Sequence, residues 1–117
     1  MSKSSTTTTE AGVRPASLAE MRRAPTHPGE MFAEEFLKPL GISQAEAARR
    51  MFMSVNRLNT IVKGRRGVSA ETAVLFAALT GTSAEFWSRL QADYDLWHAM
   101  QRMKAASRKV RPLAIAG

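Results

Sequence analysis

The residue types best able to do chemistry lie close together near the middle of the chain. Ser54, Asn56, Arg57 and Asn59 fall within the stretch "MSVNRLNTIVKGRRG", residues 53–67. The amide of asparagine can form two hydrogen bonds with the edge of adenine, and the guanidinium of arginine can do the same with guanine. This combination indicates contact with a nucleic acid. A plain helical or partner-binding domain stays open, because asparagine and arginine on an outward helix face are often only solvated.

Enzymatic chemistry has less support in the sequence. The chain contains no cysteine, which excludes thiolate metal sites and cysteine nucleophiles. The two histidines, His27 and His98, lie far apart, and neither has a second metal ligand at a suitable spacing. His27 and Glu30 suggest acid–base catalysis, but no nucleophile accompanies them, and a position at the start of a helix explains both. We therefore expect no enzyme, no metal and no cofactor.

Positive charge is concentrated in the same part of the chain. The net charge is +7, and residues 42–67 alone contain six Lys/Arg and one Glu. Such a block is the electrostatic feature expected of a phosphate-binding surface. A membrane surface would also attract it, but would require large apolar residues beside it on one amphipathic helix. The chain also lacks the roughly 20 apolar residues in a row that span a bilayer. We expect a cytoplasmic protein with no membrane partner.

Helix caps and apolar periodicity predict an all-α fold of five helices without strands. The expected helices are 28–38, a short helix after the cap Ser43, 54–63, a helix after the cap Ser69, and 83–103. Ser43 and Glu46 have the spacing of a capping box, in which each side chain bonds the backbone of the other. Residues 27–104 form the expected domain. Polar or proline-broken sequence predicts a disordered tail over 1–26 and a flexible basic tail over 105–117.

The second and third expected helices have the pattern of a helix-turn-helix. The first of them offers small residues, Ala47 and Ala48, for close packing, and the second presents a polar face to a DNA major groove. Gln44 and Ser54 suit phosphate contacts at helix N-termini, and the cations past the second helix suit the flanking backbone. The expected DNA contacts are Gln44, Ser54, Asn56, Arg57, Asn59, Thr60, Lys63, Arg65 and Arg66.

Four motifs, "HPGE", "GRRG", "GTSAEFW" and "LQADYDLW", stand in an order and spacing that resembles the HigA/VapI family of bacterial antitoxins. These are Xre-type helix-turn-helix proteins with a lambda-repressor-like fold. The resemblance implies a homodimer that binds palindromic operator DNA, represses its own toxin–antitoxin operon and has a RelE-like (HigB-type) partner toxin. An alternative is a protein-interaction module that neutralises the toxin with weak or lost DNA binding.

The resemblance also makes two local predictions. By position, 54–63 is the recognition helix, and the turn before it usually carries glycine where this chain has Phe52. Because a left-handed backbone angle is costly for a bulky residue, either the turn uses another conformation or Phe52 is strained and packed inward.

The implied dimer would place its interface late on the last helix. Aromatic residues recur there at helical spacing, and they more often form core than a ligand pocket. We assign Phe86 and Trp87 to the monomer core. The expected dimer contacts are Tyr94, Leu96, Trp97 and Met100.

Overall fold

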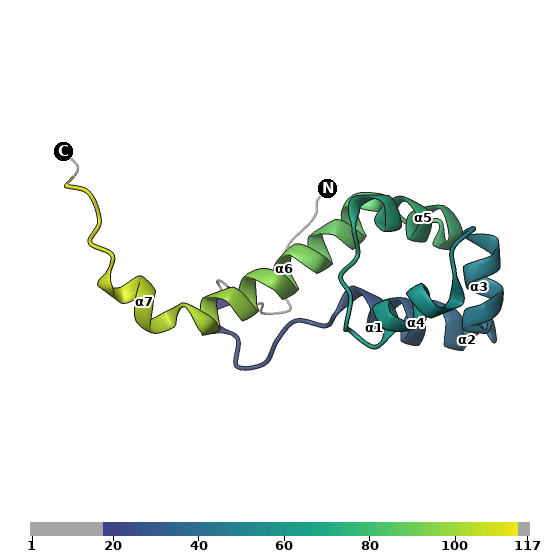
Figure 1. Ribbon diagram of the computed structural model, residues 1–117, viewed down its shortest axis with the longest axis horizontal. Helices are drawn as coiled ribbons and strands as arrows, with labels where there is room; N and C mark the ends of the chain where they lie inside the picture. The colour runs from purple at the N-terminus through teal and green to yellow at the C-terminus, as the bar shows by residue number, and fades with distance from the viewer. Residues whose placement is uncertain (1–17, 115–117) are drawn as a thin grey trace, which may run out of the picture.

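The computed structural model describes residues 18–114 of the chain. The described part contains helices and no strand, which confirms the all-α prediction. A 3₁₀ helix η1 (Leu18–Glu20) precedes α1 (Pro28–Phe32), which continues through the π-helical turn η2 (Ala33–Leu37) into α2 (Lys38–Leu40). The remaining helices are α3 (Gln44–Arg50), α4 (Val55–Val62), α5 (Ala70–Thr80), α6 (Ala84–Arg102) and α7 (Lys104–Lys109). Helices α1 to α5 pack around the first part of α6, and the second part of α6 extends away from them to α7 (Figure 1).

Serine caps set the starts of four helices, as the sequence predicts. The hydroxyls of Ser43, Ser54, Ser69 and Ser83 each accept a hydrogen bond, at 3.0 to 3.2 Å, from the backbone N–H three residues later. Such a cap contributes about 1 kcal/mol. The capping box at Ser43 is only half formed, because the Glu46 carboxylate bonds Arg49 and Arg50 instead.

Aromatic rings form the centre of the core. Phe32 and Phe76 stack with their ring centroids 3.9 Å apart, and Trp87 meets both rings edge-on. The Trp87 indole N–H donates to Thr82 Oγ1 at 2.7 Å. Phe86 packs against this cluster. These contacts match the expected core assignment and leave no ligand pocket between the rings of this cluster.

Helices α1 and α4 approach each other closely at Gly29. A Cβ atom on Gly29 would lie 1.9 Å from the carbonyl oxygen of Ile61 and 3.0 Å from Val62 Cα. Only glycine fits such a backbone contact. The N-terminus of α1 is therefore pressed against the C-terminal end of α4.

Both chain ends contain more helix than we predicted. Within the expected tail 1–26, η1 forms, and the Met21 carbonyl accepts a hydrogen bond from the Trp97 indole at 3.1 Å. Within the expected tail 105–117, α7 continues to Lys109. Residues 1–17 and 115–117 lie outside the described part. None of the helices described here has the length and apolar character needed to cross a membrane.

We predict that Gly29→Ala destabilises the fold by about 3 kcal/mol, because α1 and α4 must separate to admit the methyl group. Urea denaturation followed by circular dichroism measures the change. Gly41→Ala is the control: Gly41 has φ +66°, and an added Cβ would meet nothing within 4 Å. That variant should lose about 1 kcal/mol or less. Equal losses for the two variants would contradict the close-contact explanation.

Candidate nucleic-acid interface

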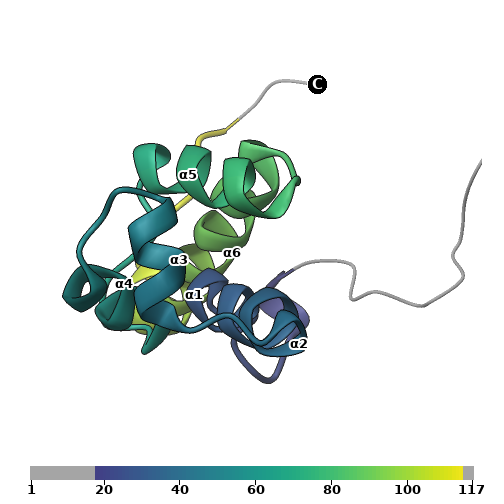
Figure 2. The ribbon, with the colours of Figure 1, turned by 90° about the vertical axis from the view of Figure 1, so that its right-hand side faces the viewer.

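Helix α4 has one face in the core and one face in solvent. Leu58 and Ile61 are fully buried, whereas Asn56, Arg57 and Lys63 at its C-cap are exposed. Helix α3 lies across α4 (Figure 2) and contributes Ala47 and Ala48 to the buried core. The expected division into a packing helix and a presenting helix is therefore present in the fold.

Gln44 and Asn59 bond each other. Asn59 Nδ2 donates to Gln44 Oε1 at 3.1 Å, which ties the start of α3 to the middle of α4. Gln44 accepts through its oxygen, so its Nε2 donors stay available for a phosphate oxygen. Asn59 is half-buried. The bond also holds the Gln44 side chain in place, and the expected role of Asn59 as a polar reader stays a prediction.

Arg57 also has a partner inside the chain. Its Nη2 donates to Thr72 Oγ1 at 3.3 Å, and Thr72 is buried at the start of α5. Arg57 therefore links α4 to α5. The guanidinium has five N–H donors, so one long hydrogen bond leaves most of its donor capacity for a base edge.

Asn56 is the best placed of the expected readers. Ser54 caps α4, and Thr60 Oγ1 donates to the Arg57 carbonyl at 2.7 Å. Within the described part of the chain, the exposed Asn56 side chain has no hydrogen-bond partner. Val55, which we did not predict as a contact, lies beside it and is 44% exposed. The sequence feature that could have identified Val55 as a contact is its position directly after the cap Ser54.

The loop after α4 carries the exposed cations Lys63, Arg65 and Arg66 on a fixed backbone. The N–H groups of Arg65 and Arg66 both donate to the Thr60 carbonyl, at 2.9 and 3.2 Å. The Val68 N–H donates to Gln91 Oε1 at 2.7 Å and anchors the far end of the loop to α6. These cations therefore stand at a defined place relative to α4.

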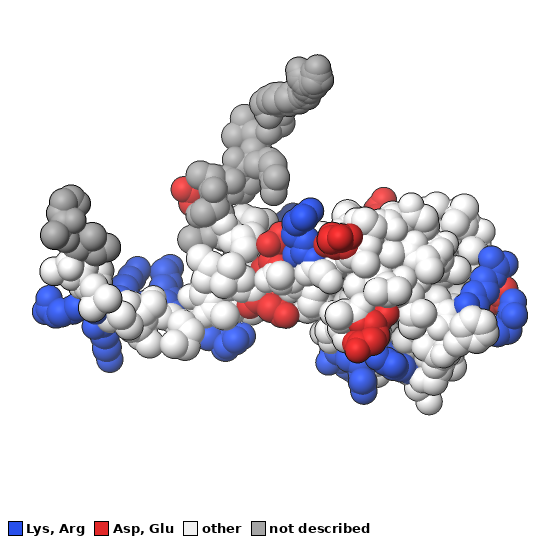
Figure 3. Space-filling view, turned by 90° about the horizontal axis from the view of Figure 1, so that it is seen from above, with Lys and Arg blue, Asp and Glu red and all other residues white. Residues whose placement is uncertain are grey.

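The basic block predicted from the sequence is not uniform. Arg49 and Arg50 both bind the Glu46 carboxylate and lower its pKa to about 2 through hydrogen bonds and charge. In the space-filling view, the Lys and Arg side chains at the end of the molecule formed by α2 and α3 surround acidic atoms (Figure 3). A further group lies along α7, at the opposite end.

The comparisons agree with this geometry. A sequence model of the family described as Helix-turn-helix matches residues 34–87. Virulence-associated protein I of Dichelobacter nodosus is 41% identical over 75 residues, which are 64% of this chain and 69% of the relative. Antitoxin HigA-1 of Vibrio cholerae is 33% identical over 99 residues, 84% of this chain and 92% of the relative. The chain belongs to the HigA/VapI family of helix-turn-helix antitoxins.

The solved structure of a family member has the same fold as this chain. The Pseudomonas aeruginosa antitoxin HigA, solved with the higBA promoter, superposes with a TM-score of 0.73 at 38% identity. The match covers 77% of this chain and 99% of that one. The family is one of helix-turn-helix antitoxins and transcription regulators, in agreement with the expectation that the chain is not an enzyme.

Phe52 occupies the turn in which the family resemblance led us to expect glycine. Its φ is +56°, the left-handed region, and its side chain is 93% exposed. The Phe52 N–H donates to the Arg49 carbonyl and the Met53 N–H to the Ala48 carbonyl. The first alternative, another conformation of the turn, is wrong, because the backbone angle is left-handed. The second is correct for the strained backbone and wrong for the ring, which is exposed instead of packed inward.

The four expected dimer contacts divide into two pairs. The Tyr94 ring meets His27 and His98, and Trp97 bonds the Met21 carbonyl, so both are used within the chain.

Burial lowers the pKa of His27, whose Nδ1 accepts a hydrogen bond from the Gly29 N–H at 2.9 Å. This keeps His27 a neutral structural cap of α1.

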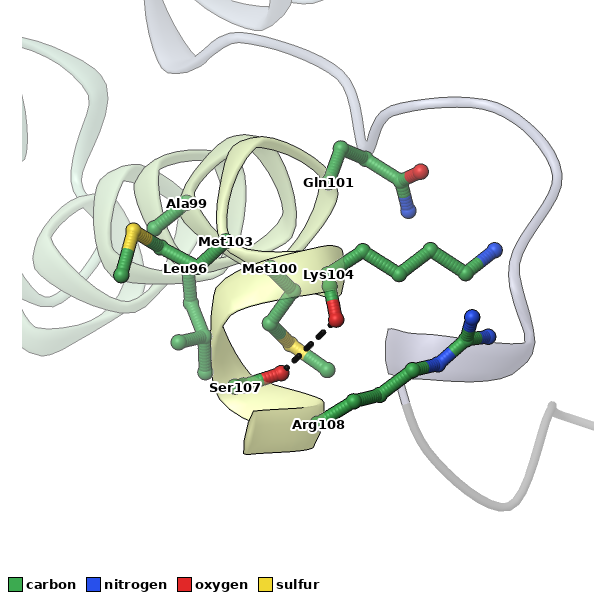
Figure 4. A pocket seen from close by; sticks show the side chains of 8 residues that line it. All are labelled: Leu96, Ala99, Met100, Gln101, Met103, Lys104, Ser107 and Arg108. Carbon is green, nitrogen blue, oxygen red and sulfur yellow. Dashed lines mark hydrogen bonds between the residues drawn. The ribbon is translucent and has the colours of Figure 1, made fainter. Parts of the chain in front are cut away.

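The other pair faces an apolar groove. Leu96 is 52% exposed, and Met100 lies next to it in a cavity of about 420 Å³ at the junction of α6 and α7 (Figure 4). Met103, which is 53% exposed, belongs to the same wall.

We predict that Phe52→Gly stabilises the fold by about 0.5–1 kcal/mol. Glycine removes about 1–2 kcal/mol of left-handed strain, and its greater freedom in the unfolded chain offsets about 0.5–1 kcal/mol of that gain. No packing is lost, because the ring is exposed. Urea denaturation of both variants tests this, with Phe52→Ala as the control that keeps the strain and should gain nothing. A loss of stability in Phe52→Gly would show that the ring makes a stabilising contact.

Proposed function

We propose that this chain is an antitoxin that represses its own operon by binding operator DNA as a homodimer. The observation that carries the proposal is the outward face of α4, where the exposed Asn56 has no hydrogen-bond partner among the described residues while Leu58 and Ile61 hold the helix on the core. The family relationship supports it, since a relative of the same fold was solved with its promoter.

Recognition in this proposal takes place in the major groove. The Asn56 amide pairs with an adenine edge, and the apolar side chain of Val55 beside it contacts a thymine methyl group. Arg57 supplies a guanine contact from the same helix turn. This combination favours operator half-sites that contain an A·T pair opposite the first turn of α4.

Binding strength comes mainly from the DNA backbone. Gln44 and Ser54 bind phosphates at the starts of α3 and α4. Lys63, Arg65 and Arg66 bind phosphates beyond the C-terminal end of α4. Each phosphate neutralised by a cation releases counterions, so affinity falls steeply as the salt concentration rises.

The dimer forms along the apolar groove of α6 and α7. Leu96, Met100 and Met103 form an exposed apolar surface there. A second copy related by a two-fold axis would cover each surface with the same surface of its partner. Two α4 helices separated by about one turn of DNA, roughly 34 Å, could then enter successive major grooves of a palindrome.

As an antitoxin, the chain also binds a toxin, for which we propose a RelE-like protein encoded beside it. Several relatives are named antitoxins, and their names support the proposal of a toxin partner. Binding to operator DNA places its action in the bacterial cytoplasm, at the nucleoid.

We predict that Asn56→Ala weakens binding to operator DNA by about 1–3 kcal/mol and leaves binding to scrambled DNA unchanged. Lys63→Ala should weaken both equally and lower the slope of log K against log salt by about 0.9. Fluorescence anisotropy with the promoter upstream of its gene and a scrambled duplex measures both. Equal loss on the two duplexes for Asn56→Ala would remove it from base reading. A wild-type chain that binds neither duplex, yet copurifies with the neighbouring gene product, would favour the toxin-binding module instead.

We predict that Leu96→Glu converts the dimer to a monomer, because the symmetric partner would bring two carboxylates together in an apolar seam. Size-exclusion chromatography with light scattering measures the mass. Leu40→Glu is the matched control, since Leu40 is 70% exposed at the end of α2, away from the groove. A Leu96→Glu variant that keeps the dimer mass would exclude this seam.

A further inference from the structure

Residues 21–26, here called the strap, run along α6 and end at the C-terminal end of the recognition helix. The Trp97 indole holds the strap at the Met21 carbonyl, 3.1 Å away. At its other end, the close contact of Gly29 with Ile61 fixes where the strap joins α1. Figure 1 shows this segment passing from the side of α6 to the start of α1. The strap is therefore attached at both ends.

We infer that the strap is a second DNA-contacting element, in which Arg22 and Arg23 bind backbone phosphates beside those bound by Lys63. The inference rests on the proposed function and adds residues outside the helix-turn-helix. It assigns them no role in base reading.

A polar cavity joins the strap to α4. It has a volume of about 440 Å³ and is lined by residues of the strap, α1, α4 and α6. Arg23 stands on one wall and Lys63 with Gly64 on another, and both cations are exposed. A water molecule takes up about 30 Å³ of liquid, so a phosphodiester group and several waters fit between the two cations.

The other titratable groups at this cavity do not remove its positive character. Glu30 lines it and is exposed, so it opposes one of the two cations, Arg23 and Lys63. His27 and Tyr94 are the other titratable residues of the lining. Since burial lowers the pKa of His27 and its Nδ1 accepts a hydrogen bond, His27 adds no positive charge at neutral pH. Counting Arg23 and Lys63 against Glu30 leaves a charge of +1 on the lining.

The strap is also rigid enough to be a preformed contact. Pro25 and Pro28 fix two backbone angles near the entry to α1. Hydrogen bonding at Met21 removes further freedom. Because these restraints exist before DNA binds, little conformational entropy is lost when Arg22 and Arg23 meet phosphate.

The test uses the full chain and the salt dependence of binding. Arg22→Ala/Arg23→Ala should lower the slope of log K against log salt by about 1.8, which is 0.9 for each lost phosphate contact. The loss should be equal on promoter DNA and on a scrambled duplex, because only the backbone is contacted. Both side chains are exposed, so the thermal midpoint of the variant should stay that of the wild type.

The matched control is Lys109→Ala/Arg111→Ala, which removes the same charge at the end of α7, outside the lining of the apolar groove and at the opposite end of the molecule from α4. It should leave the slope within error of the wild type. A strap variant with the wild-type slope, or a control that lowers the slope as much, would overturn the inference while the proposed function stands. A wild-type chain that binds neither duplex would overturn both.

Discussion

The burial of Leu58 and Ile61 in the aromatic core is the contact on which the rest of the interface depends. Both side chains have no exposed surface, and burying each stabilises the fold by about 1.5–3 kcal/mol. Their sum is a large part of the 5–15 kcal/mol typical of a whole domain. Helix α4 therefore cannot detach or rotate without unfolding the protein. This is why its opposite face, with Asn56 in the first turn, keeps one orientation toward a ligand.

The core alone would leave α4 free to shift along its axis, and contacts along the helix prevent this. In its first turn Arg57 bonds Thr72, and in its middle Asn59 bonds Gln44. At the end, Gly29 allows α1 to press against the Ile61 carbonyl. The contact of α1 with the Ile61 carbonyl also brings the strap, which precedes α1, next to Lys63, which follows α4.

Features that depend on a few neighbouring residues were predictable from the sequence. The serine caps and the buried stripe of α4 are such features, and the structure confirms them. Gln44 and Asn59 are 15 residues apart, and their bond depends on the angle between two helices. No local pattern encodes that angle, so the sequence did not predict this bond.

The same limit explains the other differences. Phe52 was known to occupy a turn that favours glycine, but its exposure depends on what packs over the turn, and nothing does. Residues 18–26 are polar and broken by proline, yet Trp97 holds them through a backbone carbonyl. A backbone acceptor is present at every residue, so no side-chain pattern marks this contact.

The distribution of charge follows from these contacts and directs the positive potential to one end of α4. Arg49 and Arg50 share the Glu46 carboxylate, so the end of α3 carries a single net positive charge despite two arginines. Among the described residues of the basic block, Lys63, Arg65 and Arg66 form no salt bridge. In the strap, Arg23 lines the same cavity as Lys63. Attraction for phosphate is thus strongest beyond the C-terminal end of α4, while Asn56 lies near its start. In the proposed complex, a duplex held at that end would present its groove along the helix to Asn56, so most of the phosphate attraction would come from one end of α4 and base reading from the other.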